Sequence, residues 1–244
     1  MTGGSSGLGL SVARCLVDRG ARVAIAARGA ERLRAAAQSL GASAIPIQMD
    51  VADKRSVAEG TDAAVAALGG LDGIVTCAGL TFAFRIESLP EERLRHLVDV
   101  SLIGTVFCIQ AAIPHLRRRG GGRIVTVSSA SARHREEFPH MAIYGAVKAA
   151  VEKLTVELRD EVKRDGIAVT CISPGAFATD ISANFDSEQM VEAYQVWRRE
   201  RGPDSDGMAD PRYFGEAVAH VLSYPPGLAV DFMEVRPNVP TPKG

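Results

Sequence analysis

The sequence predicts an α/β fold in which a doubly wound parallel sheet carries helices on both faces. Short apolar runs alternate with longer segments of helical periodicity through most of the chain, a pattern typical of right-handed βαβ units. The chain has 244 residues, and 46% of them are hydrophobic, which is enough for one sizeable core. No linker or repeat interrupts the alternation, so a single domain over residues 1–244 is expected.

Five apolar runs rich in β-branched residues predict buried strands, at residues 22–27, 44–48, 73–76, 123–128 and 167–173. The patterns around them predict helices at residues 8–19, 30–40, 54–68, 90–118 and 141–165. Gly20 and Gly41 directly follow two of these helices, where a left-handed C-terminal cap favours glycine. Ser88 and Glu91 have the spacing of a capping box, which predicts the start of the fourth helix.

The chain opens on a glycine-rich turn with no strand in front of it. Such a turn normally connects a strand to a helix, and here Met1 is followed at once by residues 2–9 of the turn. The first strand, which would be central to the sheet, is therefore predicted to be missing or truncated. We expect that a few additional upstream residues would supply this strand and raise the melting temperature.

Composition argues against several classes of partner. The 28 basic and 29 acidic residues give a net charge of -1, which argues against a nucleic acid or an anionic membrane surface. No apolar run is expected to approach the ~20 residues of a membrane span, because Gln110 interrupts the longest one, residues 102–114. The start of the chain also lacks a signal-peptide pattern, so a soluble, cytoplasmic protein is predicted.

The cysteines are scattered, without a C-x-x-C pair or a cluster of zinc-ligand spacing, at Cys15, Cys77, Cys108 and Cys171. They predict neither a disulfide framework nor a metal site. We expect small buried side chains in a reducing compartment, and no bound metal.

The glycine-rich turn is suited to binding an anion. Gly3, Gly7 and Gly9 precede a predicted helix, whose unpaired N–H groups and dipole favour a pyrophosphate. The spacing differs from G-x-G-x-x-G, and an ordinary Gly/Ser turn is the alternative. Asp50 and Val51 follow a predicted strand, where the carboxylate could hydrogen-bond an adenine base.

A second group of residues has the chemistry of acid–base catalysis. Tyr144 and Lys148 lie four residues apart on a predicted helix, so they share one face. A nearby ammonium lowers the pKa of a phenol towards neutral pH, which makes the phenol a usable general acid or base. Ser128 and Ser129 end a predicted strand at the edge where parallel sheets bind ligands. Taken alone, Tyr144 and Lys148 could equally be an ordinary amphipathic pair.

Together these residues resemble the short-chain dehydrogenase/reductase family, whose Rossmann-like fold binds a nicotinamide dinucleotide. The resemblance covers nearly the whole chain, and its ending, residues 216–237, is similar to bacterial NADP-dependent 3-hydroxy acid and alcohol dehydrogenases. It implies that Tyr144 exchanges a proton with the substrate oxygen and that Ser129 hydrogen-bonds this oxygen. It also implies that Lys148 assists the tyrosine and holds the nicotinamide ribose.

The positions predicted to bind the cofactor lie in the glycine-rich turn, at strand ends, on the catalytic helix and after the last predicted strand. They are Gly3, Ser5, Ser6, Gly7, Leu8, Arg28, Asp50, Val51, Ala78, Gly79, Tyr144, Lys148, Pro174, Gly175, Phe177 and Thr179. The resemblance implies that the last four belong to the segment that holds the nicotinamide carboxamide.

Three departures from the family pattern concern the catalytic set. Residues 76–79 read Thr-Cys-Ala-Gly where the family has Asn-Asn-Ala-Gly. Ser101 falls on the position of a fourth catalytic residue, an Asn that orders a water near the lysine. A serine can bind a water with different geometry, so we predict a catalytic role for Ser101 with an effect on the rate. The interval between Ser129 and Tyr144 is longer than usual, which leaves Ser131 as a minor alternative to Ser129.

The end of the second expected strand favours NADP(H) as the cofactor. NAD enzymes place an acid there for the ribose hydroxyl, whereas NADP enzymes favour an arginine for the 2′-phosphate. Ala27 has no carboxylate and Arg28 follows it, so NADP(H) is predicted, with NAD(H) as the alternative. Arg28 could also be a solvated arginine at a strand end.

The predicted function is an oxidoreductase that transfers hydride between NADP(H) and a small-molecule carbonyl or secondary alcohol. The alternative is a cofactor-binding sensor or scaffold with weak or no turnover, because Ser101 and the altered Asn-Asn segment weaken the catalytic set. The family implies a homotetramer or homodimer through the helices near 90–118 and 141–165.

Residues 180–212 are polar and irregular in pattern, which predicts a variable substrate lid. The aromatic residues of this region suit an apolar ligand, and its arginines suit a carboxylate. They are Phe185, Tyr194 and Trp197, and Arg198, Arg199 and Arg201. The sequence leaves the identity of the substrate open.

Overall fold

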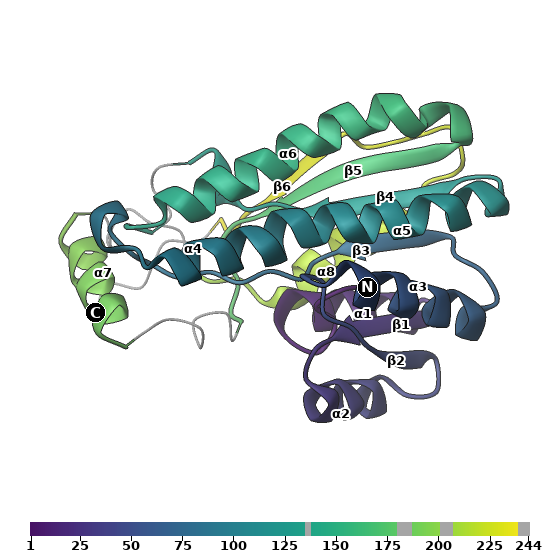
Figure 1. Cartoon of the computed structure of the whole chain (residues 1–244), viewed down its shortest axis with the longest axis horizontal. Coiled ribbons are helices and arrows are strands. Elements are labelled where there is room, and N and C mark those ends of the chain that lie inside the picture. Colours follow the sequence, from purple (N-terminus) through teal and green to yellow (C-terminus); the bar gives the residue numbers. More distant parts are fainter. Residues whose placement is uncertain (135–137, 180–186, 201–206, 239–244) are drawn as a thin grey trace.

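The structure is a computed structural model that describes residues 1–134, 138–179, 187–200 and 207–238 (Figure 1). The described strands all pair in parallel, in the orders β1-β2 and β3-β4-β5-β6. They are β1 (Val23–Ala27), β2 (Ala44–Gln48), β3 (Gly73–Thr76), β4 (Gly122–Val127), β5 (Ile167–Pro174) and β6 (Phe232–Val235). The predicted α/β fold is confirmed, and each predicted strand matches one of β1 to β5 to within one residue at either end.

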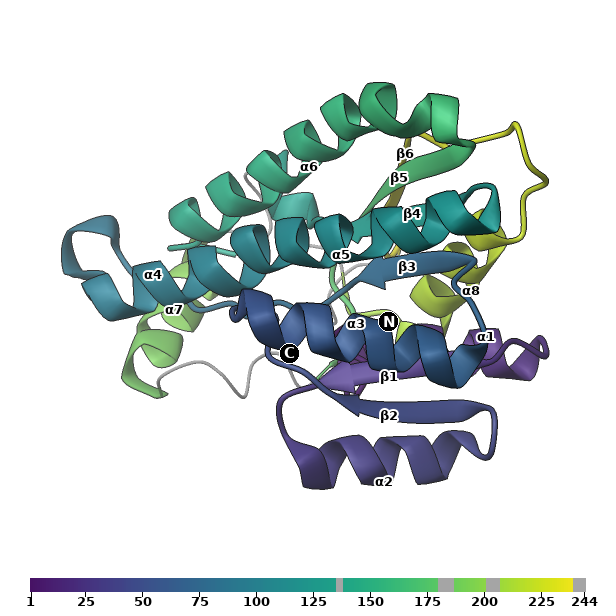
Figure 2. The same ribbon diagram turned by 45° about the vertical axis from the view of Figure 1, so that its right-hand side comes forward.

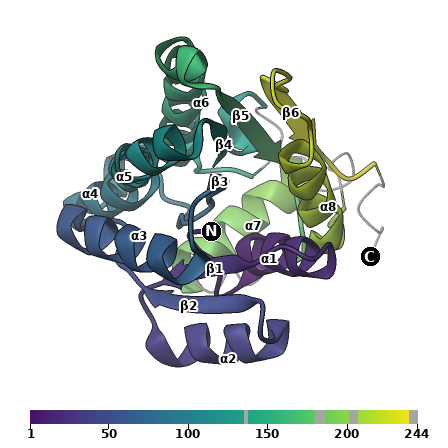
Figure 3. The same cartoon turned by 90° about the vertical axis from the view of Figure 1, so that its right-hand side faces the viewer.

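Helices cover both faces of the sheet (Figure 3). One face carries α1 (Gly7–Asp18) and α8 (Pro211–Leu222), with α2 (Ala30–Leu40) beside α1 at the β2 edge. The other face carries α3 (Lys54–Leu68), α5 (Gly104–Arg119) and α6 (Ala142–Val162). Successive side chains of β3 supply the two layers in turn, because Ile74 packs in the core under α5 and Val75 packs towards α1 and α8.

The two parts of the sheet meet at the first residues of the chain. Thr2 makes isolated parallel bridges to Ala26 of β1 and to Thr76 of β3. The Met1 amino group donates a hydrogen bond to the Ala24 carbonyl oxygen (2.9 Å), and burial lowers the pKa of this amino group to about 6. A cavity of about 500 Å³ lies next to Met1 between β1 and β3.

The long helix predicted over residues 90–118 is divided into three parts. α4 (Glu91–Val98) runs into a π-helical turn, η2 (Asp99–Ile103), which continues into α5. The predicted capping box is wrong, because Ser88 lies in a 3-10 turn and Pro90 is the N-cap of α4. The physical reason is Pro90 itself: the residue before a proline is disfavoured in a helical conformation, so the helix begins only after it.

The apolar character of this stretch also corrects an expectation. Residues 91–119 contain a window of 18 consecutive residues with a mean hydropathy of 1.8. By length and composition this stretch is a candidate membrane span. The sequence predicted no such run, because Gln110 interrupts the apolar residues. One polar residue, however, does not lower the mean hydropathy of the window enough to exclude it. In this structure the stretch packs against α3, β3 and β4, with Cys108, Ala112 and Leu116 buried in the core. It serves here as a core helix.

The region predicted as irregular, residues 180–212, contains a helix, α7 (Ser187–Glu200). Ala193 is fully buried, and Trp197 lies one helical turn further on, so the two can share a packed face. The many polar residues around them hid this spacing. Residues 180–186 and 201–206, including Phe185 and Arg201, lie outside the described residues.

Two further elements, α8 and β6, lie where no helix or strand was predicted. The start of α8 has a clear sequence signal, because the Asp210 side chain accepts a hydrogen bond from the Arg212 N–H (2.8 Å) and Pro211 opens the helix. Strand β6 gives a weaker signal, since it has four residues and all of them are only partly buried.

Candidate active site

The carboxyl ends of β1, β2 and β3 point to the side of the molecule on which α7 lies (Figure 2). Since all the described pairings are parallel, the loops after the other strands open to the same side. In open α/β sheets this edge is where ligands bind, at the point where the strand order reverses. Most of the predicted site residues lie in these loops.

The glycine-rich turn is tightly folded. Gly3 and Gly7 have φ angles of 67° and 50°, in the left-handed region that favours glycine. A Cβ on Gly9 would lie only 2.2 Å from the Gly3 carbonyl oxygen, and one on Gly3 would lie 2.9 Å from the backbone of Ala78. The Thr2 hydroxyl oxygen accepts a hydrogen bond from the Ala78 N–H (3.1 Å). These contacts fix the turn against the end of β3.

The N-terminus of α1 opens onto this turn. Ser6 is the N-cap of α1 but makes no side-chain capping hydrogen bond; Ser5 and Leu8 are half-buried on either side of Ser6 and Gly7. Within the part of the chain that the structure describes, no side chain caps the first N–H groups of α1, and together with the helix dipole these groups favour an anion. Thr179 lies across the turn, since a Cβ on Gly7 would be 3.4 Å from the Thr179 side chain. The turn, the helix start and the segment after β5 thus meet at one place.

The residues predicted to bind the adenosine end lie beyond β1 and β2. Arg28 directly follows β1 and is exposed, and its carbonyl oxygen accepts a hydrogen bond from the Gln48 side chain (3.2 Å). Asp50 lies two residues past β2, where its carboxylate accepts a local backbone hydrogen bond (3.0 Å). Val51 is buried, and its carbonyl oxygen would lie 2.9 Å from a Cβ on Gly104 at the start of α5. The Asp50 carboxylate is thus held in a fixed loop.

The segment after β4 lies along the first turns of α6. Ser128 Oγ lies 3.2 Å from the Lys148 carbonyl oxygen. A Cβ on Gly145 would lie 2.6 Å from the Ser131 carbonyl oxygen. Ser129 stands between these two contacts. Tyr144 lies on the same part of α6, with its ring centre 5.9 Å from Lys148 Nζ. Ser129, Tyr144 and Lys148 therefore occupy one small region, and all three are buried.

Ser129 is oriented by its own loop. It caps a 3-10 turn, η3 (Ala130–Ala132), and its Oγ accepts a hydrogen bond from the Ser131 N–H (3.2 Å). The hydroxyl hydrogen of Ser129 therefore remains able to donate to a ligand. Ser131, the minor alternative, lies inside the turn, with its carbonyl oxygen against α6. The two serines thus occupy different places, Ser129 at the start of the turn and Ser131 within it.

Lys148 and Ser101 face a common point. Lys148 Nζ donates to the Val127 carbonyl oxygen (2.9 Å), and burial lowers the pKa of this ammonium below its usual value of 10.5. Ser101 is also buried, and its Oγ has no hydrogen-bond partner in the part of the chain that the structure describes. A Cβ on Gly79 would lie 3.6 Å from Lys148 Nζ and 3.8 Å from Ser101 Oγ. Both side chains keep hydrogen-bonding capacity for a ligand or a water at this point.

Cys77 stands beside this point, where the resemblance implies an asparagine. Burial raises the pKa of its thiol to about 11, so the thiol is neutral near pH 7. A thiol is a weak donor and a weak acceptor, so Cys77 does not replace the two donors and the carbonyl of an amide.

The segment Pro174–Thr179 leaves the end of β5 in a fixed path. The Gly175 N–H donates to the Val235 carbonyl oxygen (2.9 Å). Phe177 is buried edge-to-face against Phe214 of α8, with ring centres 5.8 Å apart. Phe177 is therefore an anchor of the segment in the core, and Thr179 is the member of the segment that reaches the glycine-rich turn.

α7 is held over this edge from two sides. Arg85, in the loop after β3, forms an ion pair with Glu192 of α7 (2.7 Å). Phe138, in the loop after β4, lies near Trp197, with ring centres 6.5 Å apart, and Tyr194 stacks on Trp197 at 5.7 Å. The aromatic part of the predicted lid therefore contacts the loop that follows Ser129.

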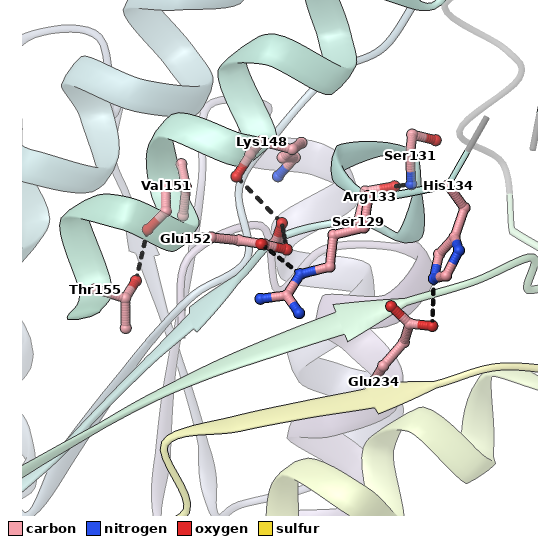
Figure 4. A network of polar contacts seen from close by, with 10 residues as sticks. Ser129, Ser131, Arg133, His134, Lys148, Val151, Glu152, Thr155 and Glu234 are labelled. Carbon is pink, nitrogen blue, oxygen red and sulfur yellow. Dashed lines mark hydrogen bonds and ion pairs between the residues drawn. The ribbon is translucent and has the colours of Figure 1, made fainter.

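The sequence analysis missed one polar residue close to Ser129. Glu152 is buried on α6, where its carboxylate accepts hydrogen bonds from Ser128 Oγ (2.9 Å) and from Arg133 Nε (2.7 Å) (Figure 4). The available signal was the spacing on the helix, since Glu152 lies one turn beyond Lys148 on a similar face.

The chain is similar to known proteins in sequence and in fold. The model of the family described as short chain dehydrogenase matches residues 1–190. An uncharacterized oxidoreductase of Staphylococcus aureus (strain MW2) is 31% identical over 97% of this chain and 95% of its own length. An alcohol dehydrogenase from the archaeon Thermococcus sibiricus, complexed with 5-hydroxy-NADP, has a TM-score of 0.83 and 26% identity, covering 100% of this chain and 97% of that chain. A serine dehydrogenase complexed with NADP+ shares the fold, with a TM-score of 0.85 and 24% identity over 96% of this chain and 92% of that chain.

Proposed function

The chain belongs to the short-chain dehydrogenase family, and we propose that it is an NADP(H)-dependent oxidoreductase acting on a small or medium carbonyl compound and the corresponding secondary alcohol. The observation that carries the proposal is the grouping of Ser129, Tyr144 and Lys148 in one buried region after β4. This region lies at the same edge of the sheet as the uncapped N-terminus of α1.

The residues at this edge fit a dinucleotide. The turn leaves no room for a Cβ at Gly9, and the α1 N-terminus offers uncapped N–H groups to a pyrophosphate. At the other end, the Ser101 hydroxyl has no hydrogen-bond partner among the described residues, and one hydrogen bond is described for the Lys148 ammonium. Both groups can therefore offer hydrogen bonds to a ribose or a water. Thr179, next to the turn, is proposed to hold the carboxamide of the nicotinamide.

The chain's own residues supply the proton and the orientation. Tyr144 protonates the carbonyl oxygen in reduction and accepts the proton of the alcohol in oxidation. Lys148 stabilises the phenolate form of Tyr144 through its charge, in surroundings where burial strengthens that interaction. Ser129 donates its free hydroxyl hydrogen to the substrate oxygen while the Ser131 N–H holds its Oγ in place. The bound nicotinamide supplies or takes up the hydride.

Ser101 is proposed to hold a water beside Lys148. Its Oγ and Lys148 Nζ lie on the same side of Gly79, close enough to share one small polar molecule. Such a water would connect the lysine to a proton source. The serine replaces a longer amide side chain, which affects the rate of proton return more than the binding of the cofactor.

The preference for NADP(H) over NAD(H) rests on Arg28. This residue is exposed directly after β1, and the preceding Ala27 carries no carboxylate that would repel a 2′-phosphate. The guanidinium can pair with the phosphate through two hydrogen bonds. Three aromatic side chains at the edge, Phe138, Tyr194 and Trp197, favour a substrate with an apolar part.

We extend the proposal to the oligomeric state and the cellular compartment of the enzyme. Only 44% of the apolar stretch within residues 91–119 is buried in this chain, so a second copy packed on α5 and α6 would cover more of it. We therefore propose a homodimer or homotetramer, which light scattering after size exclusion would show as a mass at least twice that of the chain. The four free thiols fit a cytoplasmic, reducing compartment.

The proposal is tested by thermal-shift titrations with NADPH and NADH in parallel. A ligand that binds only the folded state raises the melting temperature by mass action. NADPH should give the larger shift at equal concentration, and Arg28→Asp should reverse the order. Arg34→Asp, which makes the same charge change at an exposed position of α2, is the matched control and should keep the wild-type order. If NADPH affinity survives in Arg28→Asp, Arg28 does not read the phosphate.

A further inference from the structure

One buried carboxylate holds both ends of the loop that carries Ser129. Glu152 lies on α6, one helical turn beyond Lys148, with a side chain that is 12% exposed. A buried carboxylate must be hydrogen-bonded or paired to be tolerated. Its two oxygens have separate partners: Oε1 accepts from Ser128 Oγ (2.9 Å), and Oε2 accepts from Arg133 Nε (2.7 Å). Ser128 and Arg133 stand on either side of the turn that starts with Ser129.

The turn between these two anchors determines where the Ser129 hydroxyl lies. Ser129 Oγ accepts from the Ser131 N–H (3.2 Å), and the Ser129 carbonyl oxygen accepts from the Ala132 N–H (2.9 Å). The Arg133 N–H donates to the Ala130 carbonyl oxygen (3.0 Å). A shift of either anchor would therefore move the whole turn, and the Ser129 hydroxyl with it.

Arg133 is held from a second side by β6. Its guanidinium carbon lies 3.7 Å from the centre of the Phe232 ring, within the range of a cation–π contact. The next residue, His134, contacts Glu234 of the same strand through Nε2 (2.8 Å) (Figure 4). The carboxylate of Glu152 thus completes a connection from α6 through the catalytic loop to β6.

The Glu152–Arg133 ion pair contributes little to overall stability. The Arg133 side chain is 49% exposed, and ion pairs with such access to water contribute between zero and about 1 kcal/mol. Its geometry is nevertheless specific, because one planar guanidinium is fixed between a carboxylate and an aromatic ring. A weak contribution to folding combined with a fixed geometry next to a reacting group is typical of a positioning residue.

We propose that Glu152 is a positioning residue for Ser129, acting through Ser128 on one side and Arg133 on the other. The inference rests on the proposed function, in which the Ser129 hydroxyl donates to the substrate oxygen. A displacement of a reacting group by about 1 Å can lower the rate by as much as about 100-fold. Glu152 therefore affects kcat, and cofactor affinity depends on other residues.

The test compares variants that break one anchor. Glu152→Gln keeps one oxygen for the Ser128 hydroxyl but turns an amide NH2 group towards Arg133. Arg133→Met keeps an apolar side chain over Phe232 but has no N–H group to donate to Glu152. Each should lower kcat about 10-fold to 100-fold with little change in the NADPH thermal shift. The double variant should lose no more than the stronger single one, because both changes break the same link.

Arg159→Met is the matched control. Arg159 lies on the same helix and forms an ion pair with Asp231 next to β6 (2.5 Å), with 48% of its side chain exposed. Removing that pair should leave kcat unchanged. In a Ser129→Ala background, Glu152→Gln should lower kcat no further, because its effect passes through the serine hydroxyl.

Hydrogen exchange gives a readout that is independent of turnover. The amides of residues 130–133 should exchange faster in Glu152→Gln than in the wild type or in Arg159→Met. An unchanged kcat in Glu152→Gln beside an active wild type would overturn the positioning role alone, and so would a further loss in the Ser129→Ala background. A wild type that binds NADPH but reduces no carbonyl compound would overturn the proposed function, and the positioning role with it.

Discussion

Replacing Lys148 by methionine should make the unliganded protein more stable while removing its activity. The ammonium is fully buried, and one hydrogen bond is described for it, to the Val127 carbonyl oxygen (2.9 Å). Burial lowers the pKa of Lys148, which means that the folded state disfavours the charged form. Methionine fills a similar volume and needs no hydrogen bond.

The size of the effect follows from two opposing contributions. The variant loses one charge-assisted hydrogen bond, which contributes about 1.5–3 kcal/mol. It also avoids the desolvation of a buried ion, which costs several kcal/mol. The net gain should be about 1–3 kcal/mol in the free energy of unfolding, and each kcal/mol should raise Tm by roughly 2–4 °C for a chain of this size.

The gain should also depend on pH, with a definite sign. Between the lowered pKa of the folded state and the usual value of 10.5, the unfolded state binds more protons, so the wild type becomes more stable as pH rises. The methionine variant lacks this increase. Its advantage over the wild type should therefore be full below the lowered pKa of the folded state and should shrink as the pH rises from there towards 10.5.

Urea unfolding without cofactor, followed across this pH range, measures the difference. Lys153→Met is the control: it lies on the same helix, its side chain is 73% exposed, and its removal should change stability by no more than about 0.5 kcal/mol. A Lys148→Met variant that is less stable than the wild type at every pH would refute the view that Lys148 is held at a cost to folding.

Three other substitutions test separate parts of the account. Gly9→Ala places a Cβ 2.2 Å from the Gly3 carbonyl oxygen, so the turn must shift, and thermal-shift titration should show that NADPH binding is lost; normal binding would contradict the tight turn. Ser101→Ala removes a buried hydroxyl with no partner among the described residues, so the urea midpoint should stay unchanged or rise. The same change should lower kcat several-fold, and an unchanged kcat would remove Ser101 from the catalytic set. Phe214→Ala leaves a cavity in the core between α8 and the sheet and should cost about 3–5 kcal/mol in urea unfolding; a loss below about 1 kcal/mol would mean that the site collapses around the cavity.

The regular elements were predictable because their periodicity is local. The predicted helix over 54–68 and the predicted strands over 44–48 and 73–76 match α3, β2 and β3 at both ends. Each of these segments has a clear apolar pattern of one period. Such patterns also place Ser129 at a strand end and put Tyr144 and Lys148 on one helix face.

Features that depend on distant contacts could not be predicted in this way. The π-helical turn η2 lies in a stretch whose pattern favours a continuous helix, yet this turn contains Ser101. The partners of Glu152 come from residues 128 and 133, and they reach it only when the loop after β4 folds along α6.

The predicted capping box at Ser88 is wrong for a local reason. Pro90 competes with this motif and sets the start of α4.

The proposed function depends on proton transfer by Tyr144 in an NADPH-dependent reduction. The most direct measurement follows NADPH consumption by the wild type and by Tyr144→Phe over a panel of small and medium carbonyl compounds, with NADPH binding checked by thermal shift. We expect turnover by the wild type, a loss of about 100-fold or more in Tyr144→Phe, and equal NADPH binding by both proteins. Equal turnover by the two proteins, or NADPH binding without turnover in the wild type, would contradict the proposed function.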